Sequence, residues 1–321
     1  MRIALTGATG FVGGHLLRRL IEAGHEVRAL TRRPREPEAR VEWVAGDLAD
    51  HGALARLVEH CDAVVHVAGV LNAPDRAGFG AGNVAGTAAM IEAATTAGVH
   101  RFVHVSSLAA REPNLSLYGE SKARSEALVT ASPLPFAIVR PPAVYGPGDR
   151  ETLDLFRMAK RGVVLMPPAG RLSLIHVDDL SRLLVTLTDP AISTGLTIEP
   201  DDGQPHGYSH REFGTMLGAA VGRRVVSLST PKAILGMAAA VDKLVRGANA
   251  KLTADRVAYF CHPDWVVSSA HPVPDEWAPQ IDTYEGLADT ANWYRTAGWL
   301  QKRRDPAAVR PHIVAKAPPP P

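Results

Sequence analysis

The chain has 321 residues, of which 46% are hydrophobic and 21% charged, and its formal net charge is +2. This length allows one large α/β domain with an added lobe, or two modest domains, and it can bury a sizeable core. The near-neutral charge is mixed along the chain, which argues against nucleic acid or an anionic membrane as a partner.

The two cysteines, Cys61 and Cys261, lie far apart in the sequence. That spacing favours two inert thiols in a reducing compartment over a disulfide. The first residues enter a strand-like run without the apolar segment of a signal peptide, and no apolar run reaches the roughly 20 residues that span a bilayer. We therefore expect a cytoplasmic protein without a membrane span.

The longest apolar run extends from Ala233 to Val241. We predict that it forms a buried helix. Lys232, Lys243 and Arg246 flank the run, so attachment to a membrane surface is the alternative interpretation.

In the first half of the chain, short apolar segments alternate with amphipathic ones. The predicted strands are Arg2–Thr6, Glu26–Thr31, Val41–Ala45, Ala63–Val67, Arg101–Ser106 and Phe136–Arg140. The predicted helices are Phe11–Gly24, Gly52–His60, Asn83–Ala97 and Leu117–Ala131. Continuously apolar strands separated by helices predict an α/β fold of Rossmann type, a doubly wound parallel sheet covered on both faces.

The second half is less regular. Its predicted elements are a helix over Thr152–Arg161, strands over Leu172–Val177 and Leu196–Glu199, and a helix over Asp178–Thr188. Glycine, proline and aromatic residues follow, which predicts a smaller C-terminal substrate lobe over the carboxyl edge of the sheet. We predict a dinucleotide-binding core over residues 1–150, to which 172–200 return. The lobe takes 151–171 and 201–302, and a basic, proline-rich tail over 303–321 is expected to be disordered.

A glycine turn joins the first predicted strand to the first helix. In it, Gly7 permits the tight turn, Gly10 lets the backbone approach a pyrophosphate, and Gly13 lets the helix pack on the strand. Unpaired N–H groups and the helix dipole attract an anion there. A purely structural turn is the alternative, but the strand–turn–helix context favours dinucleotide binding. The predicted cofactor contacts are Gly7, Thr9, Gly10, Phe11, Val12 and Gly13.

The end of the second strand bears on the choice of cofactor. An NAD enzyme usually places an acidic residue there for the ribose 2′-hydroxyl, and this chain has none. Arg32 and Arg33 follow instead, and a guanidinium suits a 2′-phosphate in charge and geometry. We predict NADP, with NAD possible; two solvated loop arginines are the alternative.

Two further loops face the predicted cofactor. Asp47 and Leu48 follow the third strand, where Asp47 could meet the adenine amino group or else cap the next helix. Ala68 and Gly69 follow the fourth strand and leave little side chain where the backbone would face the cofactor.

Tyr118 and Lys122 stand at i and i+4 on one predicted helix, after Ser106 and Ser107 at the end of the fifth strand. A free phenol has a pKa of about 10, and a nearby ammonium and an oxidised nicotinamide would both lower it. A serine hydroxyl could hold a substrate oxygen beside the phenol. We predict proton transfer by Tyr118 during hydride transfer. On its own, a Tyr-x-x-x-Lys spacing is more often a solvated helix face.

Together these segments resemble the short-chain dehydrogenase/reductase superfamily, in its extended type grouped as NAD-dependent epimerase/dehydratases. The matching segments are Thr6 to Gly13, Asp47-Leu48, His66 to Gly69, Asn83 to Thr87, Val105 to Ser107, Tyr118 to Lys122, Arg140 to Gly148 and His176 to Leu180. The resemblance implies that Ser107 is the catalytic serine, Tyr118 the acid/base and Lys122 its partner. It also implies cofactor contacts by Asn83, Pro141, Tyr118 and Lys122, and a possible homodimer through the two long helices.

Two departures from the family pattern narrow the activity. Leu108 and Ala109 follow Ser107 where the dehydratases carry an Asp-Glu pair. The connection between Ser107 and Tyr118 is short, as in reductases and steroid-dehydrogenase-like members. We therefore predict an oxidoreductase that transfers hydride between NADP(H) and a carbonyl/alcohol substrate, without a metal. The alternatives are a nucleotide-sugar epimerase with bound NAD and a non-catalytic NADP-binding regulatory protein.

Overall fold

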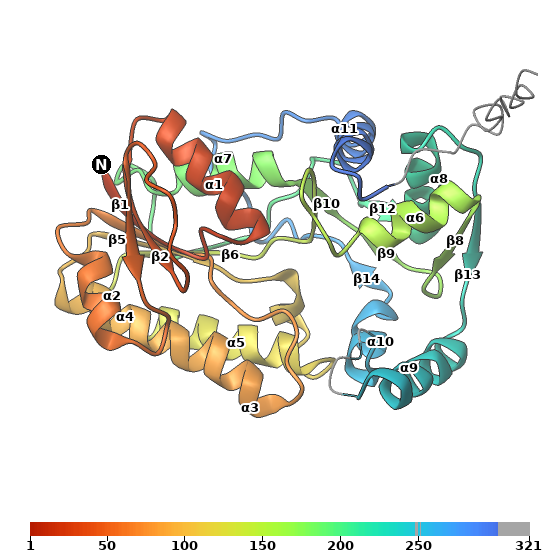
Figure 1. Cartoon of the computed structure of the whole chain (residues 1–321), viewed down its shortest axis with the longest axis horizontal. Helices are drawn as coiled ribbons and strands as arrows, with labels where there is room; N and C mark the ends of the chain where they lie inside the picture. The colour runs from red at the N-terminus through yellow and green to blue at the C-terminus, as the bar shows by residue number, and fades with distance from the viewer. Residues whose placement is uncertain (248–249, 251, 301–321) are drawn as a thin grey trace, which may run out of the picture.

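Seven parallel strands form the central sheet in the computed structural model, which describes residues 1–247, 250 and 252–300 (Figure 1). In spatial order they are β3 (Val41–Ala45), β2 (Glu26–Thr31), β1 (Arg2–Thr6), β4 (Ala63–His66), β5 (Arg101–Val105), β6 (Phe136–Val139) and β11 (Leu196–Ile198). The strand order reverses between β1 and β4, which is where doubly wound sheets bind ligands. The predicted Rossmann fold is confirmed, and the predicted tail over 303–321 lies outside the described residues.

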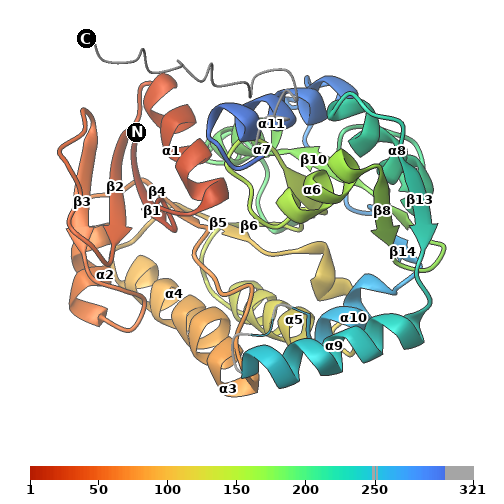
Figure 2. The same cartoon turned by 45° about the vertical axis from the view of Figure 1, so that its right-hand side comes forward.

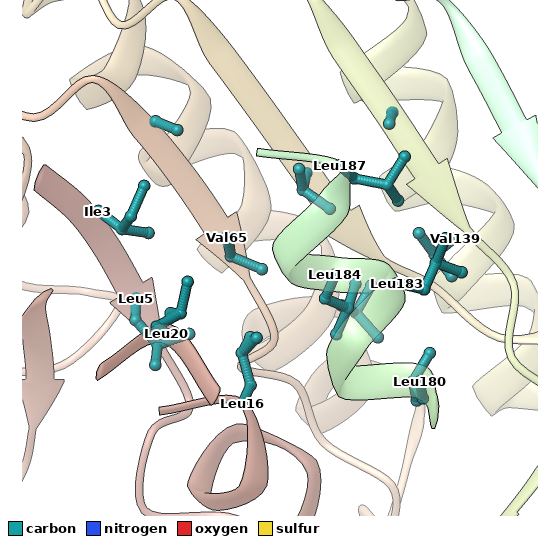
Figure 3. Packing of buried hydrophobic residues seen from close by; sticks show 14 of the residues in the cluster. Ile3, Leu5, Leu16, Leu20, Val65, Val139, Leu180, Leu183, Leu184 and Leu187 are labelled. Carbon is teal, nitrogen blue, oxygen red and sulfur yellow. The ribbon is translucent and has the colours of Figure 1, made fainter. Parts of the chain in front are cut away.

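Helices cover both faces of this sheet (Figures 1 and 2). One face carries α1 (Phe11–Glu22) and α7 (Val177–Thr186), and the other carries α2 (His51–Val58), α4 (Gly86–Thr96) and α5 (Leu117–Thr130). Figure 3 shows the apolar core between α1, α7 and the sheet, in which leucines of α1 and α7 pack on strand residues such as Ile3, Leu5 and Val139. Burying each such side chain contributes about 1.5–3 kcal/mol, so packing holds α1 and α7 over the centre of the sheet.

The C-terminal lobe has its own apolar core. Its main elements are α6 (Leu153–Arg161), β8 (Val163–Met166), α8 (His210–Ala220), β13 (Val226–Ser229) and α11 (Thr283–Thr296). Phe156 and Tyr294 are fully buried there, with ring centroids 5.2 Å apart. Below this core, α9 (Lys232–Arg246) and α10 (Ala254–Phe260) form a helical hairpin (Figure 2), and α10 contacts the start of α5 through Asp255. The short helix α3 (Arg76–Phe79) packs on α5.

The strand predicted over Leu172–Val177 is interrupted. It forms β9 (Arg171–Leu172), which pairs with β12 (Tyr208–Ser209) and β14 (Asp264–Trp265), and β10 (Leu174–His176), which pairs with β7 (Ala143–Tyr145). Ser173 separates them, because its N–H donates to the Trp265 carbonyl and its hydroxyl donates to Asp201. Neither strand joins the central sheet.

The prediction of a buried helix over Ala233–Val241 is wrong. The segment is helical, within α9, but Ala239 is its only buried residue. The helix departs from the usual rule that a surface helix turns its apolar side inward. Among the described residues we find no helix with the length and hydropathy needed to cross a bilayer.

Candidate active site

Two close contacts between backbone segments determine the shape of the glycine turn after β1. Gly7 has φ +78°, and a Cβ there would lie 2.8 Å from the Ala68 nitrogen. A Cβ on Gly13 would lie 2.0 Å from the Gly7 carbonyl oxygen, so α1 packs directly on the turn. The helix starts at Gly10 with no capping side chain and no acidic residue in its first turn. Unpaired N–H groups in such a cradle fit a pyrophosphate.

The other predicted contacts of the turn lie around this helix start. Thr9 and Gly10 are exposed, whereas Phe11 and Val12 are half-buried. The Phe11 ring packs edge-on against His15, with centroids 5.7 Å apart. The turn therefore presents backbone and a hydroxyl, rather than bulky side chains, at the switch point of the sheet.

The loops after β2 and β3 border the same edge of the sheet. Arg32 and Arg33 are both exposed. Asp47 is also exposed, and its Oδ1 accepts from the Ala49 N–H at 2.9 Å. The interpretation of Asp47 as the cap of the next helix is wrong, because Asp50 caps α2 by accepting from the Ala53 N–H.

Leu48 and the loop after β4 border the predicted cofactor site on the side of α4 and Asn83. Leu48 packs over Gly86, where a Cβ would lie 2.7 Å from its Cδ1. The Ala68 N–H donates to Thr6 Oγ1 at 3.1 Å. A Cβ on Gly69 would lie 3.0 Å from Asn83 Oδ1, so Gly69 lets this loop lie close to Asn83.

Asn83 lies in the π-helical segment η1 (Gly80–Ala85) and is buried. Its Oδ1 accepts from the Val70 N–H at 2.6 Å, and its Nδ2 donates to the Val70 carbonyl and to Ser121 Oγ. Both amide protons are therefore used within the protein. Asn83 joins the loop after β4 to α5, and its predicted cofactor contact stays a prediction.

Ser107, Tyr118 and Lys122 come together at the carboxyl end of β5. Ser107 starts the short 3-10 helix η2 (Leu108–Arg111), where its hydroxyl accepts from the Ala109 N–H at 3.2 Å and lies near enough to the Tyr118 phenol to affect its pKa. The Lys122 Nζ donates to the Val105 carbonyl at 2.8 Å, its one hydrogen bond within the described part of the chain. An ammonium has three protons to donate, so this buried group fits the hydroxyls of a cofactor ribose.

Burial sets the protonation of this group of residues. It raises the pKa of Tyr118, and the nearby Ser107 hydroxyl opposes that rise. In the protein alone the phenol pKa is therefore raised, and its lowering beside an oxidised nicotinamide stays a prediction. Burial also lowers the pKa of Lys122 to about 8, against the opposing charge of Glu126. Pro141 accepts from the Leu108 N–H at 2.9 Å and so holds the Ser107 segment against the end of β6.

Sequence reasoning missed two buried histidines beneath Lys122. His66 and His104 stack with centroids 5.5 Å apart, on neighbouring strands. His66 lies 2.8 Å from Thr6 Oγ1 and 3.1 Å from Thr87 Oγ1. Burial, with a smaller contribution from Lys122, lowers the pKa of His66 to about 3, so the imidazole is neutral. A histidine within an otherwise apolar strand was the available signal.

Sequence reasoning also missed a buried ionic network behind Ser107. Arg140 binds Glu126 through two hydrogen bonds of 2.9 and 2.6 Å and reaches Glu199 at 3.3 Å. Glu126 also accepts from the Ser106 hydroxyl, and Arg111 lies 3.4 Å from Glu199. The Glu199 side chain is fully buried. The network ties α5, β6 and β11 to η2.

Several aromatic and basic residues of the late lobe have structural roles. Trp277 is buried in the α1/α7 core and its indole N–H donates to the Asp179 carbonyl. Trp265 packs on Tyr259 at 4.6 Å, and His210 Nδ1 lies 2.7 Å from the Pro168 carbonyl. Arg171 donates to the backbone carbonyls of His206 and Gly207. In the described ranges, no three His, Cys, Asp or Glu side chains could hold a metal ion.

The fold and this group of side chains define a dinucleotide-binding enzyme of the short-chain dehydrogenase type. A family model described as the NAD dependent epimerase/dehydratase family matches residues 3–193, and the chain belongs to this family. Its members are NAD(P)-dependent oxidoreductases and epimerases.

Many known proteins are similar to the chain, and they include two reductases and a solved structure. A ceramide reductase of Caulobacter vibrioides is 41% identical over 312 residues, which cover 94% of this chain and 96% of that protein. A 2-alkyl-3-oxoalkanoate reductase of Stenotrophomonas maltophilia is 29% identical, with 89% and 97% covered. The solved structure of MoeE5 with UDP-glucuronic acid and NAD has a TM-score of 0.71 at 23% identity, with 92% and 100% covered. This last likeness shows the fold.

The buried Lys122 ammonium predicts a pH-dependent stability. Its pKa is 10.5 as an ordinary lysine and about 8 here, so the unfolded chain binds the proton more tightly. The penalty on folding is full below pH 8 and falls as the pH rises toward 10.5. Relative to Lys122→Met, the free energy of unfolding of the wild type should therefore rise by up to about 3 kcal/mol across this range in urea titrations. A pH-independent difference, as expected for the exposed Lys232→Met, would contradict the prediction.

Replacing Arg140 should cause a large loss of stability. Arg140→Met leaves Glu126 buried without its cation and leaves Glu199 with Arg111 as its remaining arginine, which should cost about 3–5 kcal/mol in the free energy of unfolding. Arg157→Met is the matched control, because Arg157 pairs with Asp154 at the surface, and should cost less than about 1 kcal/mol. Denaturant unfolding measures both losses of stability. Equal losses would show that the buried network contributes no more to stability than a surface ion pair.

Proposed function

We propose that the chain reduces a ketone on a long-chain lipid of the ceramide class with NADPH. The observation that carries the proposal is the placement of Ser107, Tyr118 and Lys122 at the end of β5, in a chain 41% identical to a ceramide reductase over 94% of its length. The second relative is also named as a reductase, of a 2-alkyl-3-oxoalkanoate. Both compounds carry alkyl chains, which supports a lipid ketone as the substrate class.

In the proposed reaction, Tyr118 acts as the proton donor. When bound, the nicotinamide supplies the hydride for the carbonyl carbon. The Ser107 hydroxyl donates a hydrogen bond to the carbonyl oxygen and holds it beside the Tyr118 phenol, which passes its proton to that oxygen. Burial raises the pKa of Tyr118, so the phenol is protonated before the reaction, as reduction requires. Lys122 holds the cofactor ribose and favours the phenolate that remains.

The exposed arginines after β2 support NADP over NAD as the cofactor. Neither Arg32 nor Arg33 donates a side-chain hydrogen bond in the described part of the chain, and no acid ends β2. Two guanidinium groups would pair with the 2′-phosphate. The turn at Gly7 to Gly13 would hold the pyrophosphate, and Asp47 would meet the adenine.

Two alternatives are less well supported. Family membership is compatible with nucleotide-sugar epimerisation, but Arg171 is already bonded to two backbone carbonyls rather than free for a sugar-nucleotide phosphate. A non-catalytic NADP-binding protein would not need the Ser107 hydroxyl near the Tyr118 phenol beside a buried lysine. A homodimer through α4 and α5 and a cytoplasmic location stay predictions.

Tyr118→Phe tests the proton transfer. It removes the hydroxyl alone, so kcat for NADPH-dependent reduction of a 3-ketoceramide should fall by about 10²–10⁴-fold, while NADPH affinity stays within error. Tyr284→Phe, at an exposed tyrosine of α11, should keep full activity. Full turnover by Tyr118→Phe would overturn the mechanism. Tightly bound NAD with inversion of a UDP-sugar carbon, and no net cofactor consumption, would favour the epimerase.

Arg32→Ser and Arg33→Ser test the cofactor. Each should weaken NADPH binding by about tenfold or more through loss of a charge-assisted contact, with NADH binding unchanged. Fluorescence titration measures both affinities. Arg35→Ser is the matched control, because Arg35 stacks over Trp43 at 5.5 Å in the same loop. Equal weakening for NADH, or none for NADPH, would argue against the 2′-phosphate contact.

A further inference from the structure

An apolar stripe lies on the outer side of α9. It consists of Ile234, Met237, Val241, Leu244 and Val245, which are 49%, 63%, 60%, 87% and 75% exposed. Their spacing of three and four residues places them on one helix face. The opposite side, with the buried Ala239, faces the rest of the protein. We call these five residues the α9 stripe. Large apolar side chains gathered on one exposed face indicate an interaction site.

The helix that carries the stripe is linked to the reaction centre through α10. It pairs with α10, and Asp255 of α10 accepts from the Leu117 N–H at 2.7 Å, at the start of the helix that bears Tyr118. Phe260, at the end of α10, is 37% exposed. The hairpin thus extends from the stripe to the residue next to the catalytic tyrosine.

The sequence segment that leads into α9 and contains it has an excess of positive charge, which favours an anionic partner. Between residues 223 and 246 the chain has five cationic side chains and one acidic one, Asp242, whereas the whole chain has a net charge of only +2. The cations are Arg223, Arg224, Lys232, Lys243 and Arg246. The preceding strand pair, β8 and β13, adds exposed apolar side chains, among them Leu165 at 50% and Val226 at 59%. Exposed apolar surface with local positive charge matches the interface of an anionic bilayer.

We propose that the α9 stripe docks the protein on an anionic phospholipid bilayer and that the α9–α10 hairpin is the route by which the lipid substrate reaches Tyr118. The membrane contact rests on the stripe and the local charge. The delivery role rests on the proposed function, because only a substrate with alkyl chains gains from staying out of water on its way to the phenol.

Sedimentation with vesicles tests the contact. The full chain should bind vesicles of phosphatidylcholine with phosphatidylglycerol, and bind phosphatidylcholine alone more weakly. Leu244→Glu should weaken binding by about tenfold or more, and adding Met237→Glu should abolish it. Tyr284→Glu is the matched control, since Tyr284 is 57% exposed on α11 and the charge change is the same. This control should bind like the wild type.

Two further measurements separate the possible outcomes. Leu244→Glu should keep wild-type circular dichroism and wild-type turnover of a short, water-soluble ketone, and should lose activity only on ketolipid held in vesicles. No binding by the wild type, or equal binding by Leu244→Glu, overturns the docking. A wild-type dimer that Leu244→Glu converts to a monomer, without vesicle binding, also overturns it, in favour of a second copy. Leu244-dependent binding without reduction of any ketolipid supports the docking and overturns only the proposed function.

Discussion

The buried contact of Arg140 with Glu126 and Glu199 is the constraint on which the site depends. Removing charges from water costs several kcal/mol per ion, and the attraction compensates only when every partner is in place. Here Glu126 comes from α5, Arg140 from the end of β6 and Glu199 from the end of β11. Because the three charged side chains must meet, α5, β6 and β11 are held in one arrangement relative to one another. Since Glu126 also accepts from Ser106, the backbone that carries Ser107 is held by the same network.

Burial of polar groups also sets their protonation states. The same low-polarity surroundings raise the pKa of Tyr118, lower that of Lys122 to about 8 and lower that of His66 to about 3. The phenol therefore begins with its proton, and the histidine below is neutral. Neutral imidazoles fill the space beneath Lys122 without adding a second positive charge. The ammonium, with a pKa of about 8, is then protonated at neutral pH, as its proposed role of favouring the phenolate requires.

The Rossmann half could be predicted from sequence because its signals are local. Apolar strands, helical spacing and the Gly7–Gly13 turn each lie within a few residues, and strands such as Arg2–Thr6 match the prediction. The lobe could not be predicted, because short strands such as Arg171–Leu172 pair with segments far along the chain. The ionic network was missed for the same reason: Arg140 and Glu199 are 59 residues apart, and no periodic pattern links them.

The α9 stripe shows that a local surface can differ from what the general burial of apolar runs and the net charge of the whole chain predict. An apolar run is usually buried, and a net charge of +2 gives no reason to expect an anionic surface. Both expectations describe the chain as a whole, whereas a docking surface is a local property. The apolar side chains of α9 point outward, and the positive charge is concentrated in the same segment. An exposed stripe costs solubility in water, since nothing in the fold covers it among the described residues. The stripe lies on the hairpin that contacts Leu117, the residue next to Tyr118. In the proposed docking, the stripe and a lipid ketone therefore both enter the membrane surface at one place, which explains why the stripe is exposed.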